Sequence, residues 1–149
     1  MRGLRDFEGR WRLRRLLRVV GLEYVFDGDA VLEPGRDHHV WTETGTLRLD
    51  GGQPHHAERR YLWREADGLI EVLYDDGRPF HAFDPNAGEV EVEHRCDPDT
   101  YIGRYDFTAF PEWSLGWDVR GPRKAYTSVT VHERLEPTAP LRDTAANET

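Results

Sequence analysis

The sequence has 149 residues, of which 32% are charged and 11% are aromatic, and its formal net charge at pH 7 is −8. This length suits one domain, and such an acidic chain is not expected to bind nucleic acid. No apolar run approaches the roughly 20 residues that a membrane-spanning helix needs, so we expect no membrane partner. The first residues lack the apolar core of a signal peptide, and the one cysteine, Cys96, excludes an internal disulfide framework. We therefore expect a cytoplasmic protein.

The first predicted strand begins near Phe7 and continues through Leu16 to Val19. Its head carries Gly9-x-Trp11, which resembles the opening of lipocalins and related barrels, where the Trp closes one end of the barrel. Several arginines follow in this stretch, and an alternative reading is a basic helix. We favour a strand with a charged outer face, because the rest of the chain has the pattern of an all-β protein.

The second and third predicted strands, residues 24–32 and 39–49, alternate apolar and polar positions with the period of two that a half-buried strand requires. Glu43 is the exception in the third strand. Alternation places this carboxylate on the inner side, between Trp41 and Leu47. A charge at such a position needs a partner, water or a ligand.

The next pair of strands meets at Asp67-Gly68, a preferred two-residue hairpin turn. Centring the register on this turn gives complementary pairs on both faces. It places Arg64 opposite Glu71 and Arg60 opposite Asp75 outside, and Trp63 opposite Val72 and Tyr61 opposite Tyr74 inside.

A second turn, Asp76-Gly77, leads into a short strand that carries His81 on its inner face. The following hairpin covers residues 89–107, with Asp97 to Thr100 as its turn. The predicted register pairs Cys96 with Tyr101, His94 with Gly103, Val92 with Tyr105, Val90 with Phe107 and, outside, Glu93 with Arg104. Parity also predicts that Phe83 pairs with Val90 and His81 with Val92.

Two more strands complete the pattern. Trp113, Leu115, Trp117 and Val119 alternate in one of them. The other covers residues 126–135, and its inner face is not decided by the pattern. The sequence therefore predicts an all-β fold, a single antiparallel up-and-down barrel of about nine to ten strands. We expect the barrel to span residues 1–136 and to be followed by a mobile tail at 137–149.

Several motifs carry a resemblance to a known family: Asp76-Gly77-Arg78-Pro79-Phe80-His81, His94-x-Cys96-x-Pro98-Asp99-x-Tyr101 and Gly121-Pro122-Arg123-Lys124. Together with Arg59 to Trp63 they resemble a small, mostly bacterial family that is known only as a domain of unknown function. The resemblance covers roughly residues 6 to 134. It implies a lipocalin-like (calycin) barrel with an internal cavity, and it implies no established activity.

The predicted inner face is unusually polar for a core. Glu43 and Arg59 lie on strands expected to pair, so we expect an ion pair between them. A barrel of this size either holds one small ligand or is filled by its own side chains. We interpret the set as the lining of a site for a small hydrophobic or amphipathic ligand. Its members are Glu43, Arg59, Tyr61, Tyr74, His81, His94, Cys96, Tyr101 and Tyr105.

Other readings stay open. One is a filled barrel that acts as an interaction module and dimerises through an outer apolar row formed by Leu62, Leu73 and Phe80. Another is a haem-binding barrel with His81 or His94 as the axial ligand. A third is an enzyme in which Glu43, His94 and Tyr101 act as acid and base. No spacing typical of a metal site is present, and no cofactor is required by the sequence.

Overall fold

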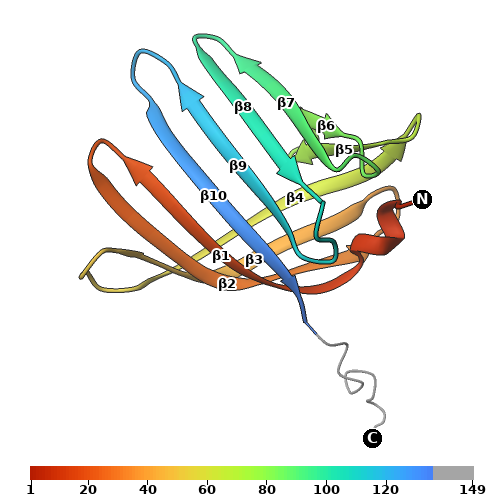
Figure 1. Ribbon diagram of the computed structural model, residues 1–149, viewed down its shortest axis with the longest axis horizontal. Helices are drawn as coiled ribbons and strands as arrows, with labels where there is room; N and C mark the ends of the chain where they lie inside the picture. Colours follow the sequence, from red (N-terminus) through yellow and green to blue (C-terminus); the bar gives the residue numbers. More distant parts are fainter. Residues whose placement is uncertain (136–149) are drawn as a thin grey trace, which may run out of the picture.

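The computed structural model describes residues 1–135, which form one short helix and one antiparallel sheet that curls into a nearly closed barrel (Figure 1). The all-β up-and-down barrel is confirmed, and the predicted tail at 137–149 lies outside the described residues. The elements are the 3₁₀ helix η1 (Leu4–Phe7) and the strands β1 (Gly9–Val19), β2 (Leu22–Pro34), β3 (His39–Leu49), β4 (His55–Ala66), β5 (Leu69–Tyr74), β6 (Pro79–Phe83), β7 (Glu89–Cys96), β8 (Asp99–Asp106), β9 (Trp113–Arg120) and β10 (Ala125–Arg134).

The strands are hydrogen-bonded in the order β6-β5-β4-β3-β2-β1-β10-β9-β8-β7. Strands that are neighbours in sequence therefore pair, except β6 and β7, which are the two edges of the sheet, and β1 pairs with β10. The predicted pairs between Phe83 and Val90 and between His81 and Val92 are wrong. They rested on alternation, which assigns a side chain to a face but does not show that two strands share hydrogen bonds.

The β7–β8 hairpin also departs from the predicted register. Its turn consists of Asp97 and Pro98 alone, and His94 pairs with Tyr101 instead of Gly103. On the outer face Arg104 accordingly meets Glu91, with Nη2 3.3 Å from Oε1, and not Glu93. The shift is two residues, so it preserves every inside and outside assignment while moving each pair along the barrel axis.

The hairpin of β4 and β5 forms with the predicted pairs Trp63–Val72 and Tyr61–Tyr74. The next ladder does not stay regular, because its register shifts between Val72 and Leu73, so that Leu73 pairs with Pro79. Phe80 turns into the barrel as a result and stacks on Tyr74, with ring centroids 4.7 Å apart. Leu73 is itself only 5% exposed. The predicted outer row of Leu62, Leu73 and Phe80 is therefore wrong.

One end of the barrel is packed solid with aromatic rings, and η1 lies there (Figure 1). Phe7 of this helix is fully buried and makes edge-to-face contacts with rings that include Trp63 and Trp113. The Trp11 indole N–H donates to the Phe7 carbonyl oxygen at 2.9 Å. The Arg134 guanidinium covers the Trp11 ring at 4.0 Å from its centroid. Trp11 thus helps to close this end, as the sequence predicted.

Candidate functional site: the barrel cavity

The opposite half of the barrel contains a cavity of about 510 Å³, a size typical of sites for small organic ligands. Every strand except β7 contributes to its wall. The lining residues are Arg15, Leu17, Val19, Phe26, Glu43, Leu47, Ala57, Glu58, Arg59, Tyr61, Tyr74, Phe80, Tyr101, Trp117, Tyr126 and Ser128. Five of the predicted site residues are among them: Glu43, Arg59, Tyr61, Tyr74 and Tyr101.

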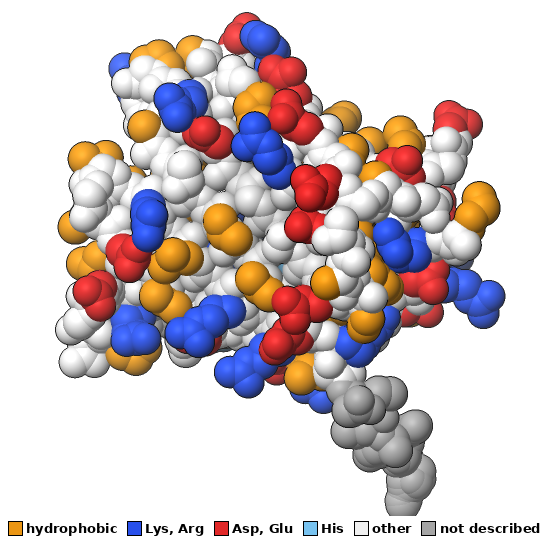
Figure 2. Space-filling view, in the orientation of Figure 1, with side chains coloured by type: hydrophobic (Ala, Val, Ile, Leu, Met, Phe, Trp, Pro, Cys, Tyr) orange, Lys and Arg blue, Asp and Glu red, His pale blue; other side chains and the backbone are white. Residues whose placement is uncertain are grey.

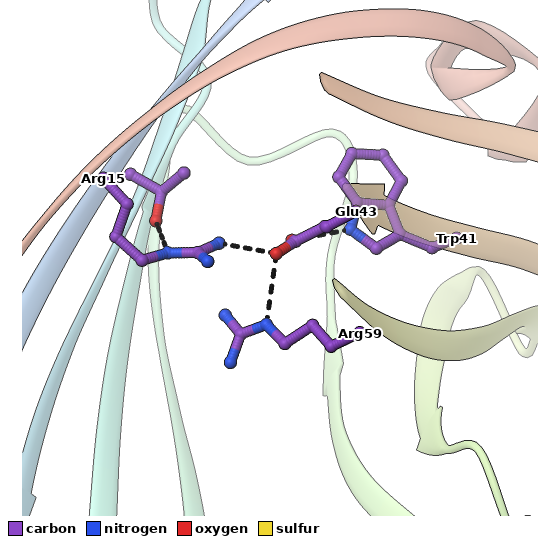
Figure 3. Close-up of polar contacts among 5 residues, drawn as sticks. Arg15, Trp41, Glu43 and Arg59 are labelled. Carbon is purple, nitrogen blue, oxygen red and sulfur yellow. Dashed lines mark hydrogen bonds and ion pairs between the residues drawn. The ribbon is translucent and has the colours of Figure 1, made fainter. Parts of the chain in front are cut away.

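Glu43 is the centre of a polar cluster in this wall (Figure 3). Its Oε1 accepts hydrogen bonds from Arg59 Nε at 3.1 Å and from Arg15 Nη2 at 3.0 Å. Its Oε2 accepts one from the Trp41 indole N–H at 2.9 Å. The predicted Glu43–Arg59 ion pair is therefore present, and Arg15 makes it a cluster of three charges.

All three groups are ionised. Burial alone would raise the pKa of the Glu43 carboxyl, but the two guanidinium groups and the Trp41 N–H outweigh burial and lower this pKa to about 2. Burial lowers the pKa of Arg15, although Glu43 opposes the shift. Burial also acts to lower the pKa of Arg59, but the Glu43 charge prevails and raises it. Arginine stays protonated throughout the physiological range, so the cluster carries one net positive charge.

Arg15 is the main residue that sequence reasoning missed. Counting alternate positions from the buried Trp11 leads through Leu13 to Arg15, so a signal was present in β1. This signal was obscured because consecutive residues of the strand are identical: Arg14 is followed by Arg15, and Leu16 by Leu17. The same residue type therefore falls on the inner and the outer face. Arg15 Nε also donates to Thr130 Oγ1 of β10 at 2.7 Å, which holds the guanidinium against Glu43.

Aromatic rings form the side of the cavity that faces this cluster. Phe80 lies between Tyr74 and Trp117, nearly parallel to both, with centroids 4.7 and 5.1 Å away. Tyr61 stacks on the same ring at 5.8 Å. Gly103 makes room for Trp117, since a Cβ built on this glycine would lie only 2.7 Å from the indole ring. This wall is therefore a stack of apolar rings bordered by phenol groups.

Two tyrosines near the rim supply hydroxyl groups. Tyr101 Oη accepts a hydrogen bond from Lys124 Nζ at 3.0 Å, and Lys124 also lies 3.6 Å from Asp99 Oδ2. Burial, reinforced by Tyr101 and Tyr61, raises the pKa of Tyr74 to about 12. Tyr74 is therefore a neutral hydroxyl at physiological pH, able to donate a hydrogen bond.

Four predicted site residues do not line the cavity. His81 and Tyr105 form a partly buried pair, with Nε2 2.7 Å from Oη, and desolvation lowers the pKa of His81 to about 3. His94 lies behind the wall, with Nε2 3.5 Å from Tyr74 Oη. Cys96 is exposed at the end of β7. No hydrogen bond joins Glu43 to His94 or Tyr101 in residues 1–135, so the proposed acid and base do not form one cluster.

The inner face of β10 was left undecided by the sequence, and the structure assigns it to Ser128, Thr130 and His132, all buried. His132 stacks on Trp113 with a centroid separation of 3.5 Å, and its Nδ1 lies 3.1 Å from the Trp113 carbonyl oxygen. Burial lowers its pKa to about 3. It is a neutral core residue outside the cavity. Across the described part of the chain, no group of three or more His, Cys, Asp or Glu residues is placed to hold a metal ion.

Comparison with known families gives a match over residues 7–134 to a family of unknown function, DUF6314. The chain belongs to this family. No curated protein matches the sequence. The domain of unknown function that the motifs resembled, with its lipocalin-like barrel, is thereby confirmed.

Among solved structures, the barrel is similar to the S-type phycobiliprotein lyase CPES from Guillardia theta, with a TM-score of 0.59 and 10% identity over 89% of this chain and 90% of that one. It is also matched by a redesigned β-barrel, mFAP1, bound to DFHBI, with a TM-score of 0.41 and 10% identity over 90% of this chain and all of that one. At this identity the likeness to CPES establishes the fold alone. In the described residues no helix is long and apolar enough to cross a membrane.

Proposed function

We propose that this protein binds one small, partly apolar organic molecule in its barrel cavity. The observation that carries the proposal is the contrast inside a single barrel: the η1 end is filled by side chains, whereas the other end holds an open cavity of about 510 Å³. The cavity combines an apolar aromatic wall with a few fixed polar groups. This combination is typical of ligand sites, in which apolar surface supplies affinity and polar groups supply orientation.

The polar groups in the cavity are held in place before any ligand arrives. Glu43 is fixed by three hydrogen bonds, and Arg15 is fixed by Glu43 and Thr130. A site that is already ordered loses less conformational entropy when it binds. The ordered lining therefore favours a binding site over a void that is merely left unfilled.

The space-filling view shows acidic and basic side chains interspersed over one face of the molecule (Figure 2). We propose that the protein works in the cytoplasm, because its one thiol, Cys96, is exposed and stays reduced there.

The experiment uses N-phenyl-1-naphthylamine, a neutral probe that fluoresces when it enters an apolar site. We expect saturable binding to the wild-type protein and at least about tenfold weaker binding to Leu47→Trp, whose larger ring would occupy the cavity. The control is Leu49→Trp, the same change two residues along β3 at a position that does not line the cavity. Equal binding by both variants, each shown to be folded by circular dichroism, would exclude the cavity as the site.

A further inference from the structure

The cavity has an unbalanced charge at its polar end. Arg15 and Arg59 share the single carboxylate of Glu43. The side chains of Glu43 and Arg15 are only 5% and 12% exposed, so water compensates them poorly. Arg59 is 49% exposed, so its outer part is open to solvent. A ligand body that enters the cavity would exclude solvent from it.

Arg59 retains hydrogen-bond donors for a ligand. It uses Nε for Glu43, and within residues 1–135 its two Nη groups donate no hydrogen bond. Figure 3 shows the Arg59 guanidinium meeting the Glu43 carboxylate through Nε. The guanidinium also lies over the Tyr61 ring, 5.4 Å from its centroid, which restrains its plane. A planar fork of free N–H groups is the arrangement that binds oxyanions bidentately.

The remaining charges near the cavity do not cancel this excess. Glu58 borders the cavity, but it is exposed and next to Arg59 on β4, so alternation directs its side chain to the outer face. Lys124 donates to Tyr101 and is paired with Asp99, whose Oδ2 lies 3.6 Å away, so it leaves the charge balance of the cavity unchanged. The cavity is therefore locally positive in a chain whose net charge is −8.

The aromatic wall of the cavity indicates the chemical character of the part of the ligand that does not bind Arg59. Phe80 stacks on Tyr74 and on Trp117. The ring planes differ by 20° in the first pair and by 17° in the second. Because Phe80 is stacked between the other two rings, this wall offers apolar surface to the cavity, which favours an apolar ligand body.

We propose that the cavity selects an organic anion: an apolar body that carries one carboxylate- or sulfonate-like group, bound by the free Nη groups of Arg59 with Arg15 behind it. This inference rests on the proposed function and adds the class of ligand. The physical reason is charge balance, since a ligand that excludes water from a net positive site leaves a cation uncompensated unless it brings an anion. With the anion bound, two guanidinium groups face two oxyanions.

The test uses two probes with the same chromophore. 8-Anilinonaphthalene-1-sulfonate is N-phenyl-1-naphthylamine with an added sulfonate, so the ratio of their dissociation constants isolates the anionic group. We expect the wild-type protein to bind the sulfonate at least about tenfold more tightly than the neutral probe. In Arg59→Met, which keeps an apolar stem but lacks the charge, the sulfonate should lose about tenfold in affinity relative to the neutral probe, so that the preference disappears.

The matched control is Arg60→Met, the same change on the neighbouring, exposed residue of β4, which does not line the cavity. It should retain the preference for the sulfonate. Arg59→Gln provides a second neutral variant in case Arg59→Met does not fold, and Arg59→Lys should recover part of the preference because it keeps the charge.

The outcomes separate the two proposals. If both probes bind in the cavity with equal affinity, or if Arg59→Met and Arg59→Gln leave the preference unchanged, the anion inference is overturned and the binding function stands. If Leu47→Trp affects neither probe, the cavity is not the site and both proposals fail. Loss of the preference in Arg60→Met as well would assign the sulfonate to the outer surface and would also overturn the inference.

Discussion

The two ends of the barrel are built from the same strands with the same alternation, yet they use their inner positions differently. At the η1 end, Phe7, Trp11 and Trp113 are at most 2% exposed and touch one another. At the cavity end, inner positions carry Arg15 and Arg59, and the latter is 49% exposed. One end therefore stabilises the fold, and the other leaves ordered polar groups beside an apolar wall.

The difference shows how a small barrel combines stability with an open site. Aromatic rings fill the narrowing end with few side chains, because each buries a large apolar area and packs edge to face. The cavity end depends on its polar groups satisfying one another, as Glu43 does with its three donors. Substitutions at the two ends should therefore separate stability from binding, and the following predictions are ordered by expected effect.

The largest effect is expected for Phe7→Ala. Phe7 is 0% exposed and contacts the surrounding rings of the closed end. Its removal should lower the free energy of unfolding by about 3–5 kcal/mol through lost burial and the cavity left behind. Urea denaturation measures the loss, and Val129→Ala, at a position 51% exposed, should cost less than about 1 kcal/mol. If Phe7→Ala, under conditions where it is folded, also weakens binding of the probe to the cavity, the two ends are not independent.

Arg15→Met should have the next largest effect. It leaves the buried Glu43 carboxylate with one guanidinium and one indole donor, and should cost about 2–3 kcal/mol, less than for a pair with no other partner. The double variant Arg15→Met/Glu43→Leu should recover a large part of this loss, because it removes the buried charge itself. Denaturation of the three proteins tests the point. A single variant as stable as the parent would show that the cluster is solvated.

The pH dependence of stability should reveal the buried histidine of the closed half. The pKa of His132 is about 3 when folded, below its ordinary value of 6.5. Between these values the unfolded chain binds the extra proton, so stability falls as pH falls, by about 1.4 kcal/mol per pH unit. His81 behaves in the same way. His132→Phe should therefore flatten the slope measured by denaturation between about pH 6 and pH 5.

The outcome that would contradict this assignment is an unchanged slope in His132→Phe. Glu43 does not interfere, since its folded pKa of about 2 lies below its ordinary value of 4.5. Its contribution to stability is fully present above about pH 4.5 and is lost only as pH falls toward 2.

The smallest effect on stability is expected for Arg59→Met. This side chain is half exposed, and Glu43 keeps Arg15 and Trp41 as partners, so the loss should stay below about 1 kcal/mol. Thermal denaturation next to Arg60→Met checks it. A loss as large as that of Arg15→Met would show that the two arginines are equivalent, and the contrast between a structural and a ligand-facing guanidinium would fail.

Much of this molecule was predictable because a strand's alternation is a local property. Hydrophobic period and turn residues were sufficient for the all-β class, the hairpin at Asp67-Gly68 and the inner position of Glu43. The same reasoning placed Arg59 on the inner face of the adjacent strand, within reach of Glu43, and the structure pairs the two residues across β3 and β4. It failed at Arg15, where consecutive arginines and leucines leave the period of two unreadable.

The sequence by itself determined which face of most strands turns inward, and thereby the barrel. Tertiary structure alone decided how far along the barrel each residue lies. His94 and Cys96 were assigned to the inner face by alternation, but they belong to the edge strand β7, which contributes nothing to the cavity wall, and Cys96 is exposed at its end. Phe80 reached the cavity only through the register shift beside Val72. A shift of two residues leaves alternation intact, so no local pattern distinguishes a side chain in the packed end from one in the cavity.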